Sequence, residues 1–168
     1  MKDTQETLIC PACGKDMDKV KMSGEGLFLD VCLKGCGGIY FDNRELEKFD
    51  EKSECIANLV KVYEGKTFKE ADQTIGRVCP ACGSNFVKNF TSIRREIEID
   101  DCYSCGGKFL DHGELEKMRG EYENTRERVN DVVQCFGLIA GKEAFETEST
   151  RRRKSLANKL FLGLTGLG

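Results

Sequence analysis

The sequence CPACG occurs twice in this chain, at residues 10–14 and at residues 79–83. A spacer of 18 or 19 residues follows each CPAC, and a second cysteine pair ending in CGG follows each spacer. Both copies then continue into an aspartate and the sequence ELEK, at residues 45–48 and 114–117. Most matched positions lie 69 residues apart, and the shift is 70 at Cys32 and Cys102 because the first copy has C-x3-C where the second has C-x2-C. The chain therefore contains an internal duplication.

Each spacer reads as a β-hairpin. In the first copy, residues 19–22 and 27–31 flank a turn at residues 23–26 that contains two glycines. In the second copy, residues 86–91 and 96–99 have the same role. A hairpin brings its two ends together, so each copy is expected to collect its two cysteine pairs into one cluster of four ligands.

Gly14 and Gly83 follow the first cysteine pair of each copy, where a tight turn is expected. Glycine tolerates the positive φ that such a turn requires. The turn would direct backbone N–H groups at the cysteine sulfurs, and such donors orient and tune thiolate ligands.

Four thiolates in a tetrahedron form a closed structural zinc site with no open position for a substrate. Each repeat is small, and units of about 40 residues usually need a metal or a disulfide to fold. We therefore expect two Zn2+ ions per chain, each bound independently by its own ribbon. Iron is the alternative, because rubredoxin-like proteins also use CPxCG and softness alone does not separate the metals. Such iron sites are surrounded by aromatic residues. This chain offers only Phe28, Tyr40 and Phe41 near the first site and Phe86, Tyr103 and Phe109 near the second, and zinc is therefore favoured over iron.

A helix is predicted after each ribbon. Asp42 with Glu45, and Asp111 with Glu114, fit the acidic variant of the capping box. Apolar residues then recur at spacings of three and four, which is typical of a helix that packs on another helix, within the chain or across a dimer. These residues are Leu46, Phe49, Ile56, Val60 and Tyr63 in the first copy and Leu115, Met118, Tyr122, Val129, Val132, Phe136 and Ile139 in the second.

The predicted fold class is a small, metal-stabilised α+β protein. It has two tandem zinc ribbons, each a β-hairpin plus a short third strand, and each followed by an amphipathic α-helix. We expect the first ribbon and the start of its helix at residues 1–52, with the rest of that helix and a linker at 53–77. The second ribbon and the start of its helix are expected at 78–120, followed by a helical segment at 121–148 and a basic, apolar tail at 149–168.

The pattern resembles the transcription factor IIB-type zinc-ribbon family of bacterial and phage proteins. The resemblance rests on CPxCG, a hairpin, CGG, an aromatic or apolar pair, Asp and ELE, and it covers residues 9–50 and 78–119. It implies that one zinc is bound by Cys10, Cys13, Cys32 and Cys36, and the other by Cys79, Cys82, Cys102 and Cys105. The C-x3-C of the first copy departs from the usual C-x2-C of the family.

Three further residues fall outside this pattern. His112 is the single histidine, and the first copy has Asn43 in its place, so His112 is expected to lie at a helix start rather than to bind metal. Cys55 and Cys135 have no counterparts in the repeat and are expected as buried or half-buried thiols in helices.

The chain has 168 residues and a formal net charge of −3, and two zinc–tetrathiolate centres would make the protein more acidic. This argues against broad, charge-driven binding to nucleic acid. A basic tail, with Arg151, Arg152, Arg153, Lys154 and Lys159, is a possible local exception. The sequence has no apolar run long enough to span a membrane and no secretory segment at its start, so a cytoplasmic location is expected.

No nucleophile–base pair or phosphate-binding loop is visible, so we expect no enzymatic activity. The leading hypothesis is a zinc-binding adaptor or regulatory protein that presents a surface to a protein partner, with the transcription machinery as a candidate. One alternative is a nucleic-acid-binding protein that uses Arg94, Arg95 and the basic tail. The other is a rubredoxin-like iron electron carrier.

Overall fold

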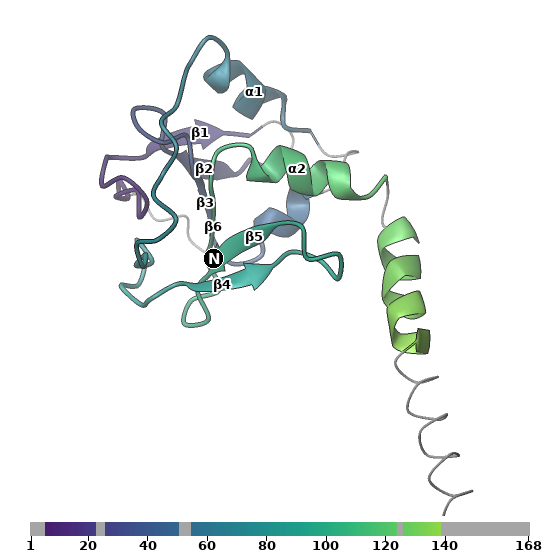
Figure 1. The fold of residues 1–168 in the computed structure, drawn as a ribbon. Helices are drawn as coiled ribbons and strands as arrows, with labels where there is room; N and C mark the ends of the chain where they lie inside the picture. Colours follow the sequence, from purple (N-terminus) through teal and green to yellow (C-terminus); the bar gives the residue numbers. More distant parts are fainter. Residues whose placement is uncertain (1–5, 23–25, 51–54, 124–125, 139–168) are drawn as a thin grey trace, which may run out of the picture. The chain divides into compact units, whose positions relative to one another are not determined.

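The computed structural model describes residues 6–22, 26–50, 55–123 and 126–138 of the chain (Figure 1). The chain divides into two compact units, Met1–Glu127 and Arg128–Gly168. The first unit contains both cysteine repeats.

Each repeat folds into three antiparallel strands, a hairpin followed by a short third strand that pairs with the second. This part of the predicted fold is confirmed. Residues 23–25 of the first predicted turn lie outside the described residues, and Gly26, which follows them, has a φ of 65°. The strands are β1 (Asp18–Lys21), β2 (Phe28–Val31) and β3 (Ile39–Phe41) in the first repeat, and β4 (Val87–Phe90), β5 (Glu98–Asp101) and β6 (Lys108–Leu110) in the second.

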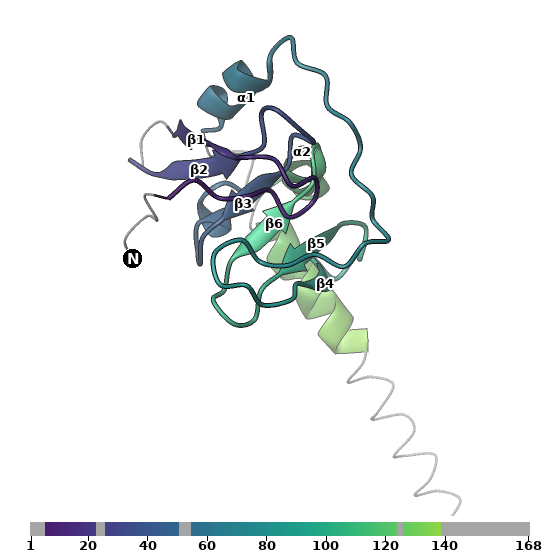
Figure 2. The ribbon, with the colours of Figure 1, turned by 90° about the vertical axis from the view of Figure 1, so that its left-hand side faces the viewer.

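The two ribbons join edge to edge. Strand β3 pairs antiparallel with β6, which places Ile39 opposite Leu110 and Tyr40 opposite Phe109. The result is one six-stranded sheet in the order β1-β2-β3-β6-β5-β4, with β3 and β6 side by side at its centre (Figure 2). The third strand of each repeat therefore has its second edge covered by the other repeat, which removes two exposed strand edges.

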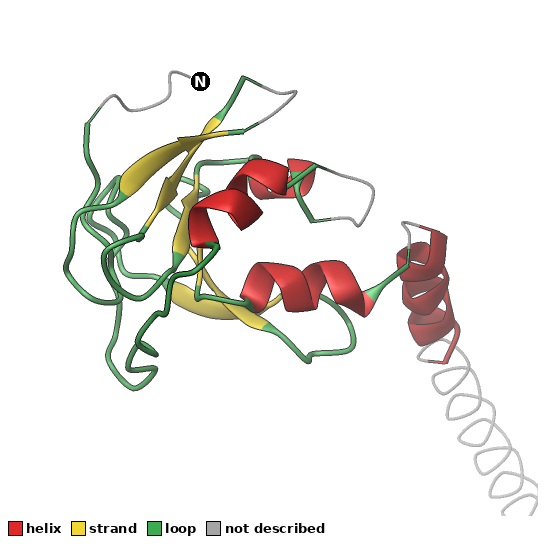
Figure 3. Ribbon diagram, turned by 90° about the horizontal axis from the view of Figure 1, so that it is seen from above, coloured by secondary structure: helices red, strands yellow, loops and turns green. Residues whose placement is uncertain are grey.

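One face of this sheet carries the helices and the main apolar core (Figure 3). The helical elements are the 3-10 helix η1 (Leu46–Lys48), α1 (Ala57–Tyr63) and α2 (Glu114–Glu121). Alternate strand residues point to this face, as the two-residue period of a strand requires. The core contains Val20, Met22, Leu29, Val31, Ile39, Phe41, Leu46, Phe49, Leu59, Ile97, Ile99, Leu110, Leu115 and Met118.

The opposite face carries a row of six side chains that runs across all six strands. The register places each residue of the row opposite the next, and the order of residue types is the same from either end apart from Tyr40 and Phe109 at the centre. The four central residues are buried. The row is Lys19, Asp30, Tyr40, Phe109, Asp100 and Lys88.

The prediction of one continuous helix after the first ribbon is wrong. The chain forms the three-residue η1, and Phe49 then leaves the helical conformation with φ −137°. The Phe49 carbonyl accepts a hydrogen bond of 2.5 Å from Arg119 Nη1. In a continuing α-helix this carbonyl would instead accept from the backbone N–H four residues later. A separate helix, α1, begins at Ala57.

The helix after the second ribbon is α2, which ends at Glu121 because Tyr122 is extended. A further helix covers residues 126–138, so the predicted second stripe is divided between two helices. Leu46, Phe49, Leu115 and Met118 lie in one core with the strand residues and with Leu59 of α1. None of the helices in the described residues is long and apolar enough to cross a membrane.

Candidate metal centres

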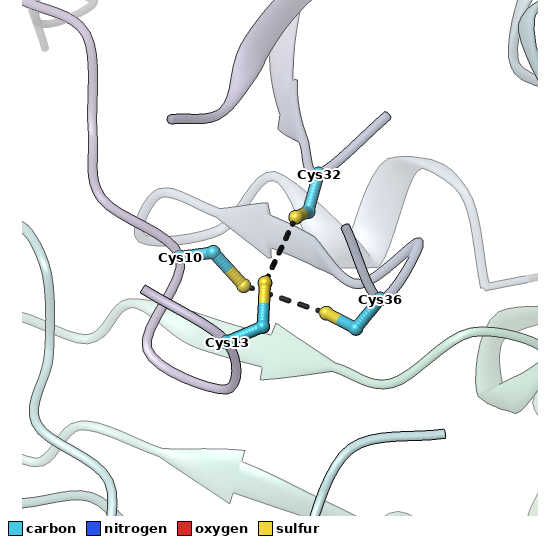
Figure 4. Close-up of side chains that lie close together, drawn as sticks. All are labelled: Cys10, Cys13, Cys32 and Cys36. Atoms are coloured by element: carbon cyan, nitrogen blue, oxygen red, sulfur yellow. Dashed lines mark hydrogen bonds between the residues drawn. The ribbon is translucent and has the colours of Figure 1, made fainter. Parts of the chain in front are cut away.

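The first four cysteines meet beside the joined strands. Cys10 and Cys13 lie on the loop that precedes β1, and Cys32 and Cys36 lie on the loop between β2 and β3 (Figure 4). Cys10 Sγ lies 3.5 Å from Cys36 Sγ, and Cys13 Sγ lies 3.4 Å from Cys32 Sγ. All four Sγ atoms lie within 4.8 Å of one another.

The second four cysteines form the same arrangement. Cys79 Sγ lies 3.6 Å from Cys105 Sγ, and Cys82 Sγ lies 3.4 Å from Cys102 Sγ. These four Sγ atoms also lie within 4.8 Å of one another. The structure thus brings together the eight cysteines selected from the sequence, in the two expected sets.

The spacing of the sulfurs fits a metal ion and not disulfides. A disulfide needs an S–S distance of about 2.05 Å, and all ten cysteines are free. In a tetrahedron with metal–sulfur bonds of about 2.3 Å, neighbouring sulfurs are about 3.8 Å apart. The observed distances of 3.4 and 3.6 Å in the second cluster are close to that separation. Each cluster therefore has the ligand set and the size for one tetrahedral metal ion.

Backbone donors surround the sulfurs, as the tight turns predicted. The N–H groups of Ala12 and Gly38 donate to Cys10 and Cys36. The N–H groups of Ala81 and Gly107 donate to Cys79 and Cys105 in the matching way. The turn glycines adopt the expected positive φ, 71° at Gly14 and 75° at Gly83. Such donors lower the energy of the thiolate form, which is the form that binds metal.

The thiols of each cluster compete for charge. The hydrogen bond between Cys10 and Cys36 raises the pKa of Cys10 and lowers the pKa of Cys36 to about 5. Burial raises the pKa of Cys32 to about 11 and the pKa of Cys79 to about 12. Hydrogen bonds from Ser84 lower the pKa of Cys82 to about 6. A divalent cation at the centre would resolve this competition, because it favours the thiolate form of all four groups.

The extra residue of the first copy does not open its cluster. The Cys13–Cys32 distance equals the Cys82–Cys102 distance of the second copy. Gly35 lies between the two cysteines of the longer pair, and a Cβ atom there would be 2.6 Å from Cys13 Sγ and 2.7 Å from Cys32 Sγ. The longer loop therefore fits around the same cluster because a residue without a side chain lies against the sulfurs.

Tyr40 was expected near the first cluster, and it packs in one apolar cluster with cysteines of both sites. Its hydroxyl, which the sequence did not assign to the second site, lies 3.6 Å from Cys79 Sγ and 3.8 Å from Cys105 Sγ. Burial, followed by the hydrogen bond with Cys79, raises the pKa of Tyr40 well above its usual range. The repeat alignment pairs Tyr40 with Phe109, and this difference was the available signal that the clusters are not equivalent.

The residues outside the clusters divide between confirmed and corrected expectations. His112 lies outside both sulfur clusters, and its ring packs 5.3 Å from the Tyr63 ring and 4.7 Å from the Phe68 ring. Cys135 is half-buried in the helix at residues 126–138, as expected. Cys55 is exposed and precedes α1, so the expectation of a buried helical thiol is wrong there.

The arginines proposed for nucleic-acid contact are engaged within the chain. Arg94 donates a hydrogen bond of 2.6 Å to the Glu121 carbonyl and lies 4.3 Å from the centre of the Tyr122 ring. Arg95 lies over the Phe90 ring at 5.5 Å. The basic tail at residues 149–168 lies outside the described residues.

The fold and the two clusters define a metal-binding protein built from two tandem four-cysteine ribbons. Residues 9–52 and 78–119 match the family described as transcription factor zinc-finger, the TFIIB-type zinc ribbon. The chain belongs to this family, and the matched residues are the two repeats. Comparison with curated proteins and with solved structures gives no match.

Proposed function

We propose that this chain is a non-catalytic, cytoplasmic adaptor that binds two zinc ions and presents the fused ribbons to a protein partner. The observation that carries the proposal is the pair of closed four-sulfur clusters within one sheet. Four thiolates complete the tetrahedral coordination of zinc, so such a site leaves no position for a substrate. Its contribution is to stabilise the fold, as structural zinc does in small ribbons.

Zinc is the proposed metal because the chain belongs to a zinc-ribbon family and offers soft ligands in tetrahedral sets. The test is elemental analysis combined with a visible absorption spectrum, on the full chain purified without added metal. Two zinc ions per chain and no colour are expected. Iron with strong visible thiolate bands would overturn the adaptor proposal in favour of an electron carrier. Mixed loading would be resolved by competition between zinc and iron for the apoprotein, in which zinc is expected to win.

The second ribbon supplies the surface for a protein partner. Strand β4 is the last strand of the sheet, and its Val87 and Phe90 are 45% and 42% exposed. Tyr103 is 71% exposed and accepts a hydrogen bond from Asn89 of β4, so it lies beside the strand. The other outer strand, β1, is contacted by α1, whose Asn58 donates to the Lys21 carbonyl. An edge strand with apolar side chains is a surface to which a partner can add a strand.

The transcription machinery is the proposed partner class, and RNA polymerase is the first protein to test.

The partner test is co-purification of the chain with RNA polymerase from the same cells. Phe90→Lys and Tyr103→Ala should each reduce co-purification at least fivefold, because they remove apolar contact area at the β4 edge. The control is Val60→Ala, at a side chain that is 54% exposed on α1, and it should leave co-purification unchanged. Equal co-purification of the wild type and the three variants would contradict the proposed surface. Binding to DNA or RNA that falls steeply with salt, and that is lost on removal of residues 151–168, would favour the nucleic-acid alternative instead.

A further inference from the structure

Tyr40 crosses from one repeat to the metal cluster of the other. It belongs to β3 of the first ribbon and is 1% exposed, yet its hydroxyl contacts two sulfurs of the second cluster. The contacted sulfurs, of Cys79 and Cys105, are themselves 3.6 Å apart, so the hydroxyl lies over one edge of the tetrahedron. A phenol is a strong donor, and a thiolate is an acceptor that gains from a charge-assisted hydrogen bond.

The sheet fixes this position. Pairing of β3 with β6 holds Tyr40 opposite Phe109, so its ring extends over the second ribbon. Gly107 lies under the ring, and a Cβ atom at that position would be 2.7 Å from Tyr40 Cζ and would overlap the hydroxyl. The second glycine of the CGG sequence is therefore needed at residue 107 so that the neighbouring repeat can reach the sulfurs.

We infer that Tyr40 is a positioning residue for the second metal centre and that it couples metal binding at the two clusters. The inference rests on the proposed metal binding at both sites. Tyr40 is placed by β3, and β3 is anchored by the first cluster through the hydrogen bond from Cys32 N–H to the Gly38 carbonyl. A metal ion in the first cluster thus stabilises the strand that supplies a donor to the second.

The extra donor acts on one cluster. Its counterpart in the second repeat is Phe109, which has no hydroxyl and packs its ring against Gly38. Loss of the Tyr40 hydroxyl should therefore weaken the second centre and spare the coordination of the first. The coupling of affinities is nevertheless reciprocal, because any factor by which the first metal favours the second must also act in reverse.

The test is Tyr40→Phe in the full, zinc-loaded chain, since this change removes a single oxygen atom. Zinc release to a chromophoric chelator is followed while the newly reactive cysteines are alkylated and located by peptide mass spectrometry. We expect Cys79 and Cys105 to become reactive on the order of tenfold faster than in the wild type, a typical effect of losing a partner of a metal ligand. Cys10 and Cys36 should change much less.

The matched control is Tyr63→Phe, which removes a tyrosine hydroxyl that donates a 2.7 Å hydrogen bond to the Gly37 carbonyl. It costs a comparable hydrogen bond but touches no sulfur of the second cluster, so release from Cys79 and Cys105 should change much less than in Tyr40→Phe. Two 113Cd resonances of the cadmium-loaded chain give a second readout. Tyr40→Phe should move the resonance of the second centre and leave the other in place.

Equal acceleration at both clusters, or an unchanged rate at Cys79 and Cys105, would overturn the inference. If Tyr40→Phe did not fold, the cadmium-loaded wild type would decide. In it, the Tyr40 hydroxyl proton should be protected from exchange and show scalar coupling to one 113Cd nucleus, and a rapidly exchanging hydroxyl would count against the inference. A wild-type chain that binds no metal would contradict the proposed function itself, which is a different result.

Discussion

Tyr40 and Phe109 lie opposite each other where the two ribbons join, at equivalent positions of the two repeats. Each ring lies against a glycine of the other repeat, Tyr40 against Gly107 and Phe109 against Gly38. These contacts lie at the centre of the joint on the sulfur side of the sheet, while Ile39 and Leu110 of the same strand pair are buried in the main core on the other side. The duplicated sequence thus builds one domain from two ribbons through a nearly symmetric exchange of aromatic rings.

Gly38→Ala and Gly107→Ala should both destabilise this joint. Neither glycine has a positive φ, so the effect is steric: a Cβ at Gly38 would be 3.0 Å from Phe109 Cε2 and 3.1 Å from the Leu110 carbonyl oxygen. We expect a loss of about 1–3 kcal/mol in the free energy of unfolding, as for other overpacked cores. Chemical denaturation of the zinc-loaded protein measures this loss.

Gly76→Ala is the matched control, because a Cβ there meets nothing within 4 Å and the φ is not positive. Its effect should stay within about 0.5 kcal/mol. A joint glycine variant that unfolds at the same denaturant concentration as Gly76→Ala would show that the rings tolerate the added methyl group.

Gly35→Ala should impair the first metal centre directly, and the second centre to a much smaller extent through the shared strand pair β3–β6. Its Cβ would lie 2.6 Å from Cys13 Sγ, inside the sulfur cluster, so either the loop or the sulfur must move. We expect zinc release from Cys13 and Cys32 to accelerate on the order of tenfold or more. Alkylation mapping during chelation separates the two centres, and preferential release from Cys82 and Cys102 would contradict the prediction.

The sequence alone was sufficient to assign the eight cysteines to their two clusters and to place the hairpins. Cysteine spacing and a hairpin-length spacer define each cluster, because both are local constraints on a short chain. The helix-start signals were also informative: Asp42 N–H donates to Glu45 Oε2 at 3.0 Å, and Asp111 N–H donates to Glu114 Oε2 at 2.8 Å. These hydrogen bonds form as predicted even though the first leads into η1 and not into a long helix.

What could not be predicted depends on contacts between distant residues. The β3–β6 pairing links residues about 70 positions apart, and nothing in either three-residue strand specifies the other. The first helix ends early because Phe49 is buried in the shared core, with its ring centre 6.2 Å from that of Phe41. Its carbonyl also accepts a hydrogen bond from Arg119 of the second repeat. Tertiary packing overrode an apolar periodicity that was otherwise typical of one continuous helix.

Arg77→Leu tests a buried charge network on the sulfur side of the sheet. Arg77 Nη1 lies 2.6 Å from Asp100 Oδ2 and 2.9 Å from Asp111 Oδ2. The Arg77 side chain is 2% exposed. The first repeat has Leu8 at the equivalent position, so leucine is compatible with the local fold. Removing the cation leaves two carboxylates without their shared partner, and we expect a loss of about 3 kcal/mol in the free energy of unfolding.

The comparison for Arg77→Leu is Lys34→Ala, which breaks the exposed 3.0 Å pair with Asp18. Exposed pairs contribute about 0–1 kcal/mol, so this variant should unfold close to the wild type. Adding Asp100→Asn to Arg77→Leu should recover part of the loss, because it removes a buried carboxylate whose remaining cationic partner is the more exposed Lys88, 3.2 Å away. No recovery would indicate that packing of Arg77 on the Phe109 ring, 5.4 Å away, accounts for the effect.

Cys13→Ser and Cys82→Ser decide whether the ribbons are independent. If the ribbons were independent, each variant would lose the zinc of the mutated ribbon and retain the zinc of the other. The structure changes this expectation, because Tyr40 and Phe109 belong to one apolar cluster with cysteines of both sites. Unfolding the first ribbon would withdraw β3 from β6 and the Tyr40 hydroxyl from Cys79.

We therefore expect Cys13→Ser to hold well below a single zinc ion per chain at a chelator concentration that leaves the wild type fully loaded. Elemental analysis after dialysis against graded chelator measures the occupancy, and alkylation mapping identifies the site that retains metal. Cys55→Ser is the control, since this exposed thiol belongs to neither cluster. A Cys13→Ser chain that keeps one zinc at the second site with wild-type affinity would show that the ribbons fold separately and that their shared sheet does not couple the two centres.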